Sequence, residues 1–122
     1  MARSKSIEDL QKKVVKFRDD RDWKQFHTPK DLSMSIAIEA AELMECFQWK
    51  TKEDVEKYIN SEKSEEISEE MADILVYLLN LADVLNIDIL KSAYNKLEKN
   101  AAKYPVEKAK SNAKKYTELE RM

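Results

Sequence analysis

The 122-residue chain contains no glycine. Glycine supplies the left-handed backbone of tight hairpins and lets a loop approach phosphate groups closely. Its absence excludes glycine-rich phosphate loops, dinucleotide-binding fingerprints and glycine-dependent hairpins, so any bound phosphate must be held by other means. A chain of this length suits one compact domain, and we expect residues 1–122 to form a single domain.

Helical periodicity and capping residues predict an all-α fold. No segment alternates strictly enough to be a strand. Pro29 is expected to break the helical pattern and to leave residues 23–29 as an ordered aromatic loop. Candidate N-caps are Ser6, Asp31, Thr51, a serine at 61 or 64, and Asp88. Helices are predicted over residues 6–22, 31–49, 51–60, about 61–85 and 89–103, with a last turn or short helix after Pro105 and then a charged tail.

Residues 71–85 are apolar nearly all round, because Asp73, Asn80 and Asp83 are the only exceptions. A helix of this kind must be buried on several sides. One thin domain can hardly provide that burial, so we expect a homo-oligomer in which helices of partner chains complete a bundle.

Charge and cysteine content narrow the partners and the compartment. The chain has 22 basic and 24 acidic residues, a net charge of −2, which argues against a strongly basic nucleic-acid binder. No apolar run approaches the roughly 20 residues needed to span a membrane. The lone Cys46 cannot form an internal disulfide, and no signal-peptide core follows residues 1–5. We therefore expect a cytoplasmic protein with no nucleic-acid or membrane partner.

Negative charge gathers in the middle of the chain. Residues 31–49 hold four acids, residues 64–90 hold seven, and neither segment has a Lys or Arg. Two acidic pairs have a spacing of three residues, which places each pair on one helical face: Glu39 with Glu42, and Glu70 with Asp73.

No cation lies one turn from Glu39 or Asp73. Crowded carboxylates in apolar surroundings need a raised pKa or a compensating cation, and hard Mg²⁺ prefers oxygen ligands. The residues leave two interpretations, a divalent-metal site and solvated surface acids. A diiron bundle is a weaker alternative, because it needs Glu-x-x-His motifs and His27 lies outside both helices.

The pairs Glu39-Ala-Ala-Glu42 and Glu70-Met-Ala-Asp73 resemble the acidic signature of the MazG-type all-α NTP pyrophosphohydrolases. Over about residues 7–119 the chain resembles the dCTP pyrophosphatase branch, at residues 21–27, 47–50, 69–78, 103–106 and 114–117. The resemblance implies a helical bundle completed by oligomerisation, with a tetramer favoured and a dimer as the alternative. It also implies cleavage of the α–β phosphate bond of dCTP or modified pyrimidine deoxynucleotides, giving a monophosphate and pyrophosphate and so sanitising the nucleotide pool.

By the same resemblance, Glu39, Glu42, Glu70 and Asp73 are the ligands of Mg²⁺, for which Mn²⁺ could substitute. Glu42 is our candidate general base, and Glu45 either orients the water or faces solvent. Trp23, Trp49 and Tyr77 are candidate walls of a base pocket, although aromatic residues at such positions are ordinarily core residues. His27 either donates a hydrogen bond or braces its loop.

Candidate phosphate and nucleotide contacts lie on the helix predicted at 89–103 and just beyond it. They are Lys96, Asn100, Lys103 and Tyr104. For Lys96 the alternative is an exposed, solubilising lysine. The chain departs from its relatives at Val14, where some have a polar group, and at Ala101 and Ala102, where some have longer polar side chains. The contrasting hypothesis for the whole chain is a non-enzymatic helical oligomer or adaptor whose acids bind a structural metal.

Overall fold

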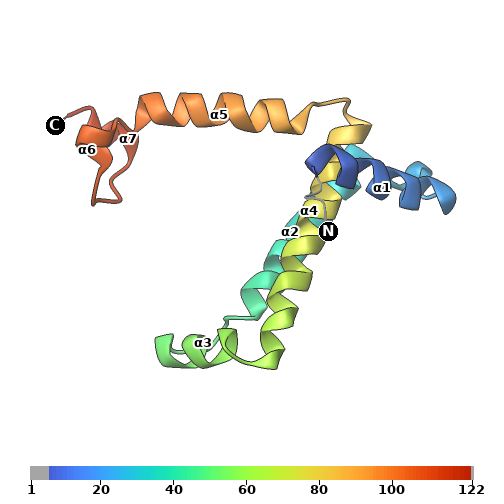
Figure 1. Cartoon of the computed structure of the whole chain (residues 1–122), viewed down its shortest axis with the longest axis horizontal. Helices are drawn as coiled ribbons and strands as arrows, with labels where there is room; N and C mark the ends of the chain where they lie inside the picture. The colour runs from blue at the N-terminus through green and yellow to red at the C-terminus, as the bar shows by residue number, and fades with distance from the viewer. Residues whose placement is uncertain (1–5, 122) are drawn as a thin grey trace, which may run out of the picture. The chain divides into compact units, whose positions relative to one another are not determined.

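The computed structural model describes residues 6–121. All regular secondary structure in that range is helical (Figure 1). The prediction of an all-α fold is confirmed. The α-helices are α1 (Ile7–Asp20), α2 (Pro29–Glu45), α3 (Lys52–Ile59), α4 (Glu65–Val84), α5 (Ile89–Lys103), α6 (Val106–Ala109) and α7 (Tyr116–Leu119), and the 3₁₀ helices are η1 (Lys24–Phe26) and η2 (Glu62–Ser64). None of the helices in residues 6–121 has the length and apolar character needed to cross a bilayer.

The chain divides into two compact units, Met1–Ile87 and Asp88–Met122. Our expectation of a single domain over residues 1–122 stays a prediction. Residues 1–5, on which the expectation of a missing signal peptide rests, and Met122 at the end of the charged tail lie outside the described residues.

Side-chain caps start three helices where the sequence predicts them. Ser6 Oγ accepts a hydrogen bond from the Asp9 amide at 3.1 Å at the start of α1. Thr51 forms a capping box at the start of α3, in which its hydroxyl and the carboxylate three residues later each accept a backbone N–H. Asp88 caps α5 by accepting from the Lys91 amide at 3.0 Å.

The start and end of the second predicted helix were wrong. Thr28, not Asp31, is the N-cap of α2, and its hydroxyl accepts from the Asp31 amide at 3.2 Å. Pro29 is the first residue of the helix, because a missing N–H costs nothing in the first turn and the fixed φ suits a helix. At the other end α2 stops at Glu45 instead of continuing to Trp49, whose φ of 66° is left-handed.

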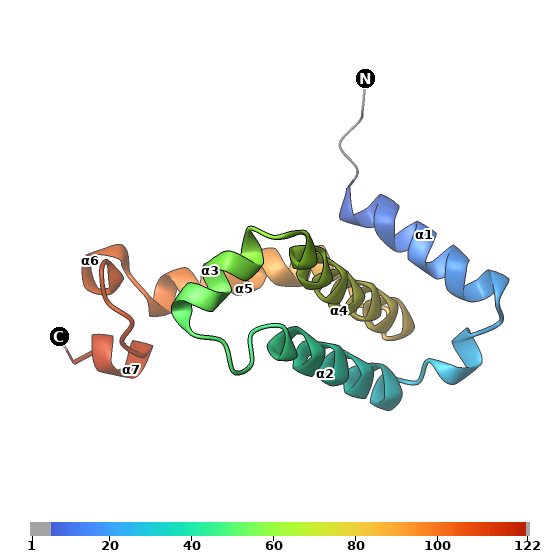
Figure 2. The same ribbon diagram turned by 90° about the horizontal axis from the view of Figure 1, so that it is seen from below.

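The core of the first unit is the packing of α2 against α4, which run antiparallel and side by side in both views (Figures 1 and 2). Leu32 of α2 and Leu79 of α4 are each only 1% exposed. Helix α1 also contacts α4, with Val14 buried and Gln11 Nε2 donating to the Leu79 carbonyl at 3.0 Å. Two long helices are thereby fixed face to face, with a third against one of them.

Several large apolar side chains on α2 and α4 remain outside this core. Met34, Ile38 and Met71 are each more than half exposed. The chain thus leaves apolar surface uncovered on α4, for which we expected burial on several sides, and on the neighbouring α2.

The second unit begins with α5 and continues through two short helices. The sequence predicts α5 and the turn after Pro105, but it misses α7 (Tyr116–Leu119), where we expected only a charged tail. Leu119 is 1% exposed, and the rings of Tyr104 and Tyr116 meet edge to face at 6.4 Å. Helix α7 is therefore packed, because Leu119 is buried and the Tyr116 ring contacts Tyr104.

Candidate active site

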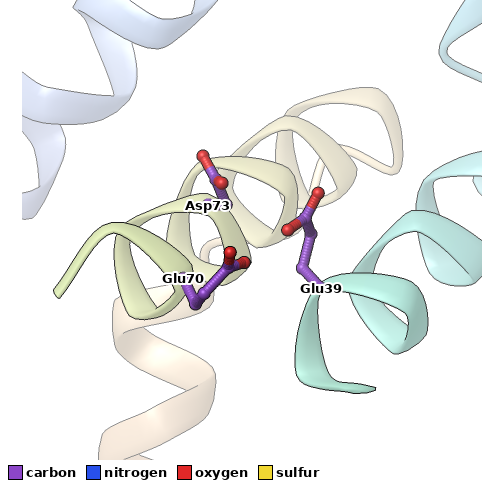
Figure 3. Close-up of side chains that lie close together, drawn as sticks. All are labelled: Glu39, Glu70 and Asp73. Carbon is purple, nitrogen blue, oxygen red and sulfur yellow. The ribbon is translucent and has the colours of Figure 1, made fainter. Parts of the chain in front are cut away.

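Three carboxylates from two helices converge where α2 packs against α4. Glu39 comes from α2, while Glu70 and Asp73 come from successive turns of α4 (Figure 3). Each offers a carboxylate oxygen, and these oxygens all lie within 4.8 Å of one another. The antiparallel packing of the two helices is what brings residues more than 30 positions apart into one cluster.

The buried oxygens of this cluster have no partners within the described residues. Glu39 Oε2 and Glu70 Oε2 are both inaccessible to solvent and make no hydrogen bond to the protein. None of the salt bridges in residues 6–121 involves Glu39, Glu70 or Asp73. A buried carboxylate oxygen without a partner is costly, so the cluster needs a proton or a cation.

The surroundings raise the pKa of Glu39 from 4.5 to about 7. The largest cause is the neighbouring carboxylate of Glu42, to which Glu39 can donate only when it is protonated, and burial and the nearby negative charges add to it. The pKa of Glu70 is also raised. The neighbouring Glu39 acts in the opposite direction there, because its protonated form can donate to the Glu70 carboxylate, but burial and the other carboxylates outweigh this effect.

These donors fit a divalent cation. Carboxylate oxygens from three residues match the preference of hard cations, and a cation would satisfy the two orphaned oxygens and offset the mutual repulsion. Glu42 is outside this tight cluster, but its charge raises the pKa of both Glu39 and Glu70, and it lines a groove together with Glu70. Three of the four predicted ligands therefore form the tight cluster, and Glu42 lies beside two of them.

A pocket of about 430 Å³ adjoins the cluster and shares Asp73 with it. Its walls come from α1, α4 and the loop between α1 and α2. Trp23 and Tyr77, two of the three aromatic residues predicted for a base pocket, line it together with His27. The ring of Trp23 packs edge to face on Phe17 with centroids 5.8 Å apart, which holds the indole against the pocket.

Sequence reasoning missed the buried arginine of this pocket. Arg18 is 2% exposed, and its guanidinium donates to Asp83 at 2.8 Å and to Asp19 at 2.9 Å. Burial and the charge of Arg18 lower the pKa of His27, because both disfavour the imidazolium form. Two sequence signals could have indicated the pair, because Arg18 follows Val14 by one turn on the buried side of α1, and Asp83 is an acid without a local cation.

Trp49 and Glu45 do not line the pocket that contains Trp23 and Tyr77. Trp49 is 92% exposed and does not line the pocket. Glu45 lines a separate, acidic groove that also includes Glu42 and Glu70.

The predicted phosphate contacts belong to the second unit. Lys96 and Asn100 are one turn apart on α5, and Lys103 is its last residue. Tyr104 follows as the C-cap and donates its backbone N–H to the Asn100 carbonyl at 2.9 Å. The Lys103 ammonium lies 4.8 Å from the centre of the Tyr116 ring.

Comparison with known proteins identifies the family of this chain. The chain matches the model of the MazG-like family over residues 34–119. It is 35% identical over 119 residues to dCTP pyrophosphatase 1 of Rattus norvegicus, covering 95% of this chain and 69% of the relative. It is 36% identical over 115 residues to dCTP pyrophosphatase 1 of Homo sapiens, covering 93% and 68%.

Solved structures agree. The crystal structure of a pyrophosphatase from Archaeoglobus fulgidus matches with a TM-score of 0.75 and 43% sequence identity, covering 86% of this chain and 97% of that one. The family match, the relatives and the fold show an all-α nucleotide pyrophosphatase, which confirms the predicted enzyme class. The chain belongs to the MazG-like family.

Proposed function

We propose that this enzyme is a Mg²⁺-dependent hydrolase that cleaves the α–β phosphate bond of dCTP or of modified pyrimidine deoxynucleotides. The observation that carries the proposal is the shared position of Asp73, which belongs both to the acidic cluster and to the aromatic pocket. A nucleotide with its base in the pocket would have its phosphates near the carboxylates. The similarity to dCTP pyrophosphatase 1 of two mammals supports the choice of dCTP.

Glu39, Glu42, Glu70 and Asp73 would hold the metal. A bound divalent cation supplies charge neutralisation at the triphosphate and Lewis-acid polarisation. Glu42 would accept the proton of the attacking water. The water oxygen forms a bond to the α-phosphorus, and the bond from that phosphorus to the bridging oxygen breaks, so a monophosphate and pyrophosphate leave.

The remaining predicted residues take supporting parts in the proposal. Trp23 and Tyr77 would bracket the base, because both line the apolar pocket beside Asp73. Trp49 would contribute from a partner chain, since in its own chain it stands away from the pocket. Lys96, Asn100, Lys103 and Tyr104 would contact the phosphates and sugar, as the resemblance implies.

We further infer a homo-oligomer, a tetramer by the resemblance with a dimer as the alternative. The exposed side chains of Met34, Ile38 and Met71 on the two central helices support it, because apolar surface of this kind gains free energy when covered. The single Cys46, which is not in a disulfide, is compatible with the reducing cytoplasm that we propose as its location.

A product-resolved assay tests the activity. Purified protein with Mg²⁺ is incubated with dCTP, 5-substituted dCTP, dUTP, dTTP and the ribonucleotides, and released pyrophosphate is separated from orthophosphate. We expect pyrophosphate, fastest from the cytosine deoxynucleotides. Glu42→Gln and Asp73→Asn should each lower kcat by at least about a hundredfold, whereas Glu98→Gln on an exposed face of α5 should not.

Two results would contradict the proposal. If no nucleotide is hydrolysed, or if both site variants stay fully active, the assignment fails. Loss of thermal stability in those variants without any hydrolysis to lose would instead support the non-enzymatic helical oligomer.

A further inference from the structure

One buried polar group in the pocket has no role in the mechanism above. Asn80 lies on α4 and is 4% exposed, in a pocket whose other walls include Val14, Phe17 and Trp23. Its Nδ2 donates to the Val76 carbonyl one turn earlier at 3.3 Å, which turns the amide so that Oδ1 is its free end. That oxygen is inaccessible to solvent and has no hydrogen-bond partner within residues 6–121.

An unmet acceptor of this kind destabilises the fold, because a carbonyl oxygen loses its hydrogen bonds to water on burial and gains none in return. The Arg18 guanidinium also lines the pocket, but its hydrogen bonds go to Asp19 and Asp83. Lys13, Trp23, His27 and Tyr77 also carry polar atoms on the pocket wall, but none of them makes a hydrogen bond to Oδ1. A ligand that enters the pocket is therefore the natural partner for Oδ1.

The position of Asn80 along α4 fits one part of a nucleotide. Asp73, Tyr77 and Asn80 are spaced by four and then three residues, so they follow one face of the helix. Seven residues of helix rise about 10 Å, which is comparable to the reach from the α-phosphate to the outer edge of a base. With the phosphates at Asp73 and the ring beside Tyr77, the edge of the base would lie at Asn80.

We propose that Asn80 is a specificity-determining residue whose Oδ1 accepts a hydrogen bond from an N–H group on the edge of a pyrimidine base. The inference rests on the proposed function, because it takes the pocket as the base site. The donor is either the exocyclic amino group of a cytosine or the ring N3–H of a uracil or thymine. The polar side chains that α1 puts on the pocket wall, Lys13 and Arg18, are donors, whereas Asn80 of α4 has a free acceptor for an N–H group of the base.

The test pairs each substrate with a methylated analogue that lacks the donor. Wild-type protein and Asn80→Leu are compared on dCTP against N4,N4-dimethyl-dCTP, and on dUTP against N3-methyl-dUTP. We expect wild type to prefer one unmethylated partner in kcat/KM by about tenfold to a hundredfold, as loss of one buried hydrogen bond implies. In Asn80→Leu that preference should fall to near unity, and the pair in which it falls identifies the donor.

The matched control is Asn60→Leu. Asn60 makes the same local bond, from its Nδ2 to the Glu56 carbonyl at 2.7 Å, but it is the exposed C-cap residue of α3 and lies outside the pocket. This variant should keep the wild-type preference. The inference is overturned if wild type tolerates both methylations, or if Asn80→Leu keeps the wild-type preference, since bulk alone would then explain it.

A binding measurement separates this inference from the proposed activity. Trp23 lines the pocket, so the intrinsic tryptophan fluorescence of the wild-type chain and of Asn80→Leu reports binding of deoxycytidine and deoxyuridine without metal or turnover. We expect the affinity for one nucleoside to exceed that for its methylated analogue by about tenfold or more. If no nucleotide is hydrolysed but this preference is seen, the proposed activity fails and the role of Asn80 stands. If nucleotides are hydrolysed but wild type shows no preference for an unmethylated partner in either assay, the proposed activity stands and the role of Asn80 fails.

Discussion

Replacing Glu39 with glutamine should stabilise the metal-free protein above neutral pH. The pKa of Glu39 is raised from 4.5 to about 7, so the folded chain binds this proton more tightly than the unfolded chain does. Its contribution to stability is fully present below pH 4.5 and is lost as the pH rises through 7. Glutamine carries no charge at any of these pH values and keeps a hydrogen-bond donor for the neighbouring carboxylate.

The pKa difference sets the size of the effect. A rise from 4.5 to about 7 corresponds to about 3 kcal/mol. Solvent screening at this half-buried side chain reduces the expected gain to about 1–2 kcal/mol, which raises Tm by about 4–8 °C for a chain of this size.

The assay is urea unfolding in a metal chelator at several pH values between 4.5 and 8.5. The gain of Glu39→Gln over wild type should be small at pH 4.5, grow through pH 6 and level off above pH 7.5. Glu98→Gln, an exposed substitution in the middle of α5, should change the free energy of unfolding by less than about 0.5 kcal/mol at every pH.

Divalent cation should reverse the order of stability. A ligand that binds only the folded state adds about 2.7 kcal/mol at a concentration of 100 Kd, and the glutamine variant binds it more weakly. Equal stability of wild type and Glu39→Gln at pH 8 in chelator would refute the electrostatic reasoning, as would a difference that does not vary with pH.

Two further substitutions test how the first unit is held together. Arg18→Met should lower the free energy of unfolding by about 2–4 kcal/mol, because it removes two charge-assisted hydrogen bonds and leaves Asp83 without its partner. The control is Lys16→Met, at the exposed pair with Asp20, which should lower it by less than about 1 kcal/mol in the same urea titration. Thr51→Ala should cost about 1 kcal/mol by removing half of the α3 capping box, and Thr51→Ser should restore most of it; an alanine variant as stable as wild type would show that the cap is not needed.

The parts of the fold that depend on local chemistry could be predicted from the sequence. The caps at Ser6, Thr51 and Asp88 act within three residues, so their helices start where the pattern indicates. Pro29 misled the prediction because the same residue ends a helix from inside and favours one from its first position. Helix α7 was missed because its buried leucine stands alone in a charged segment.

In the candidate site, too, the features set by local sequence could be predicted and those created by tertiary packing could not. The acidic cluster could be anticipated because the absence of cations one turn away from Glu39 and Asp73 is visible in the sequence. The pairing of Arg18 with Asp83 spans 65 residues, and only the packing of α1 on α4 creates it. The free acceptor of Asn80 likewise depends on which side chains surround it, and no spacing rule gives that.

The tryptophan at position 49 destabilises the fold of the single chain. A residue with a Cβ loses about 1–2 kcal/mol in left-handed backbone, and this indole is also 92% exposed. Glycine at this position would remove both the backbone strain and the exposed apolar side chain. A variant library sorted only for thermostability should therefore drift away from tryptophan at position 49, and one sorted for catalytic turnover should keep it if the indole works on a neighbouring chain.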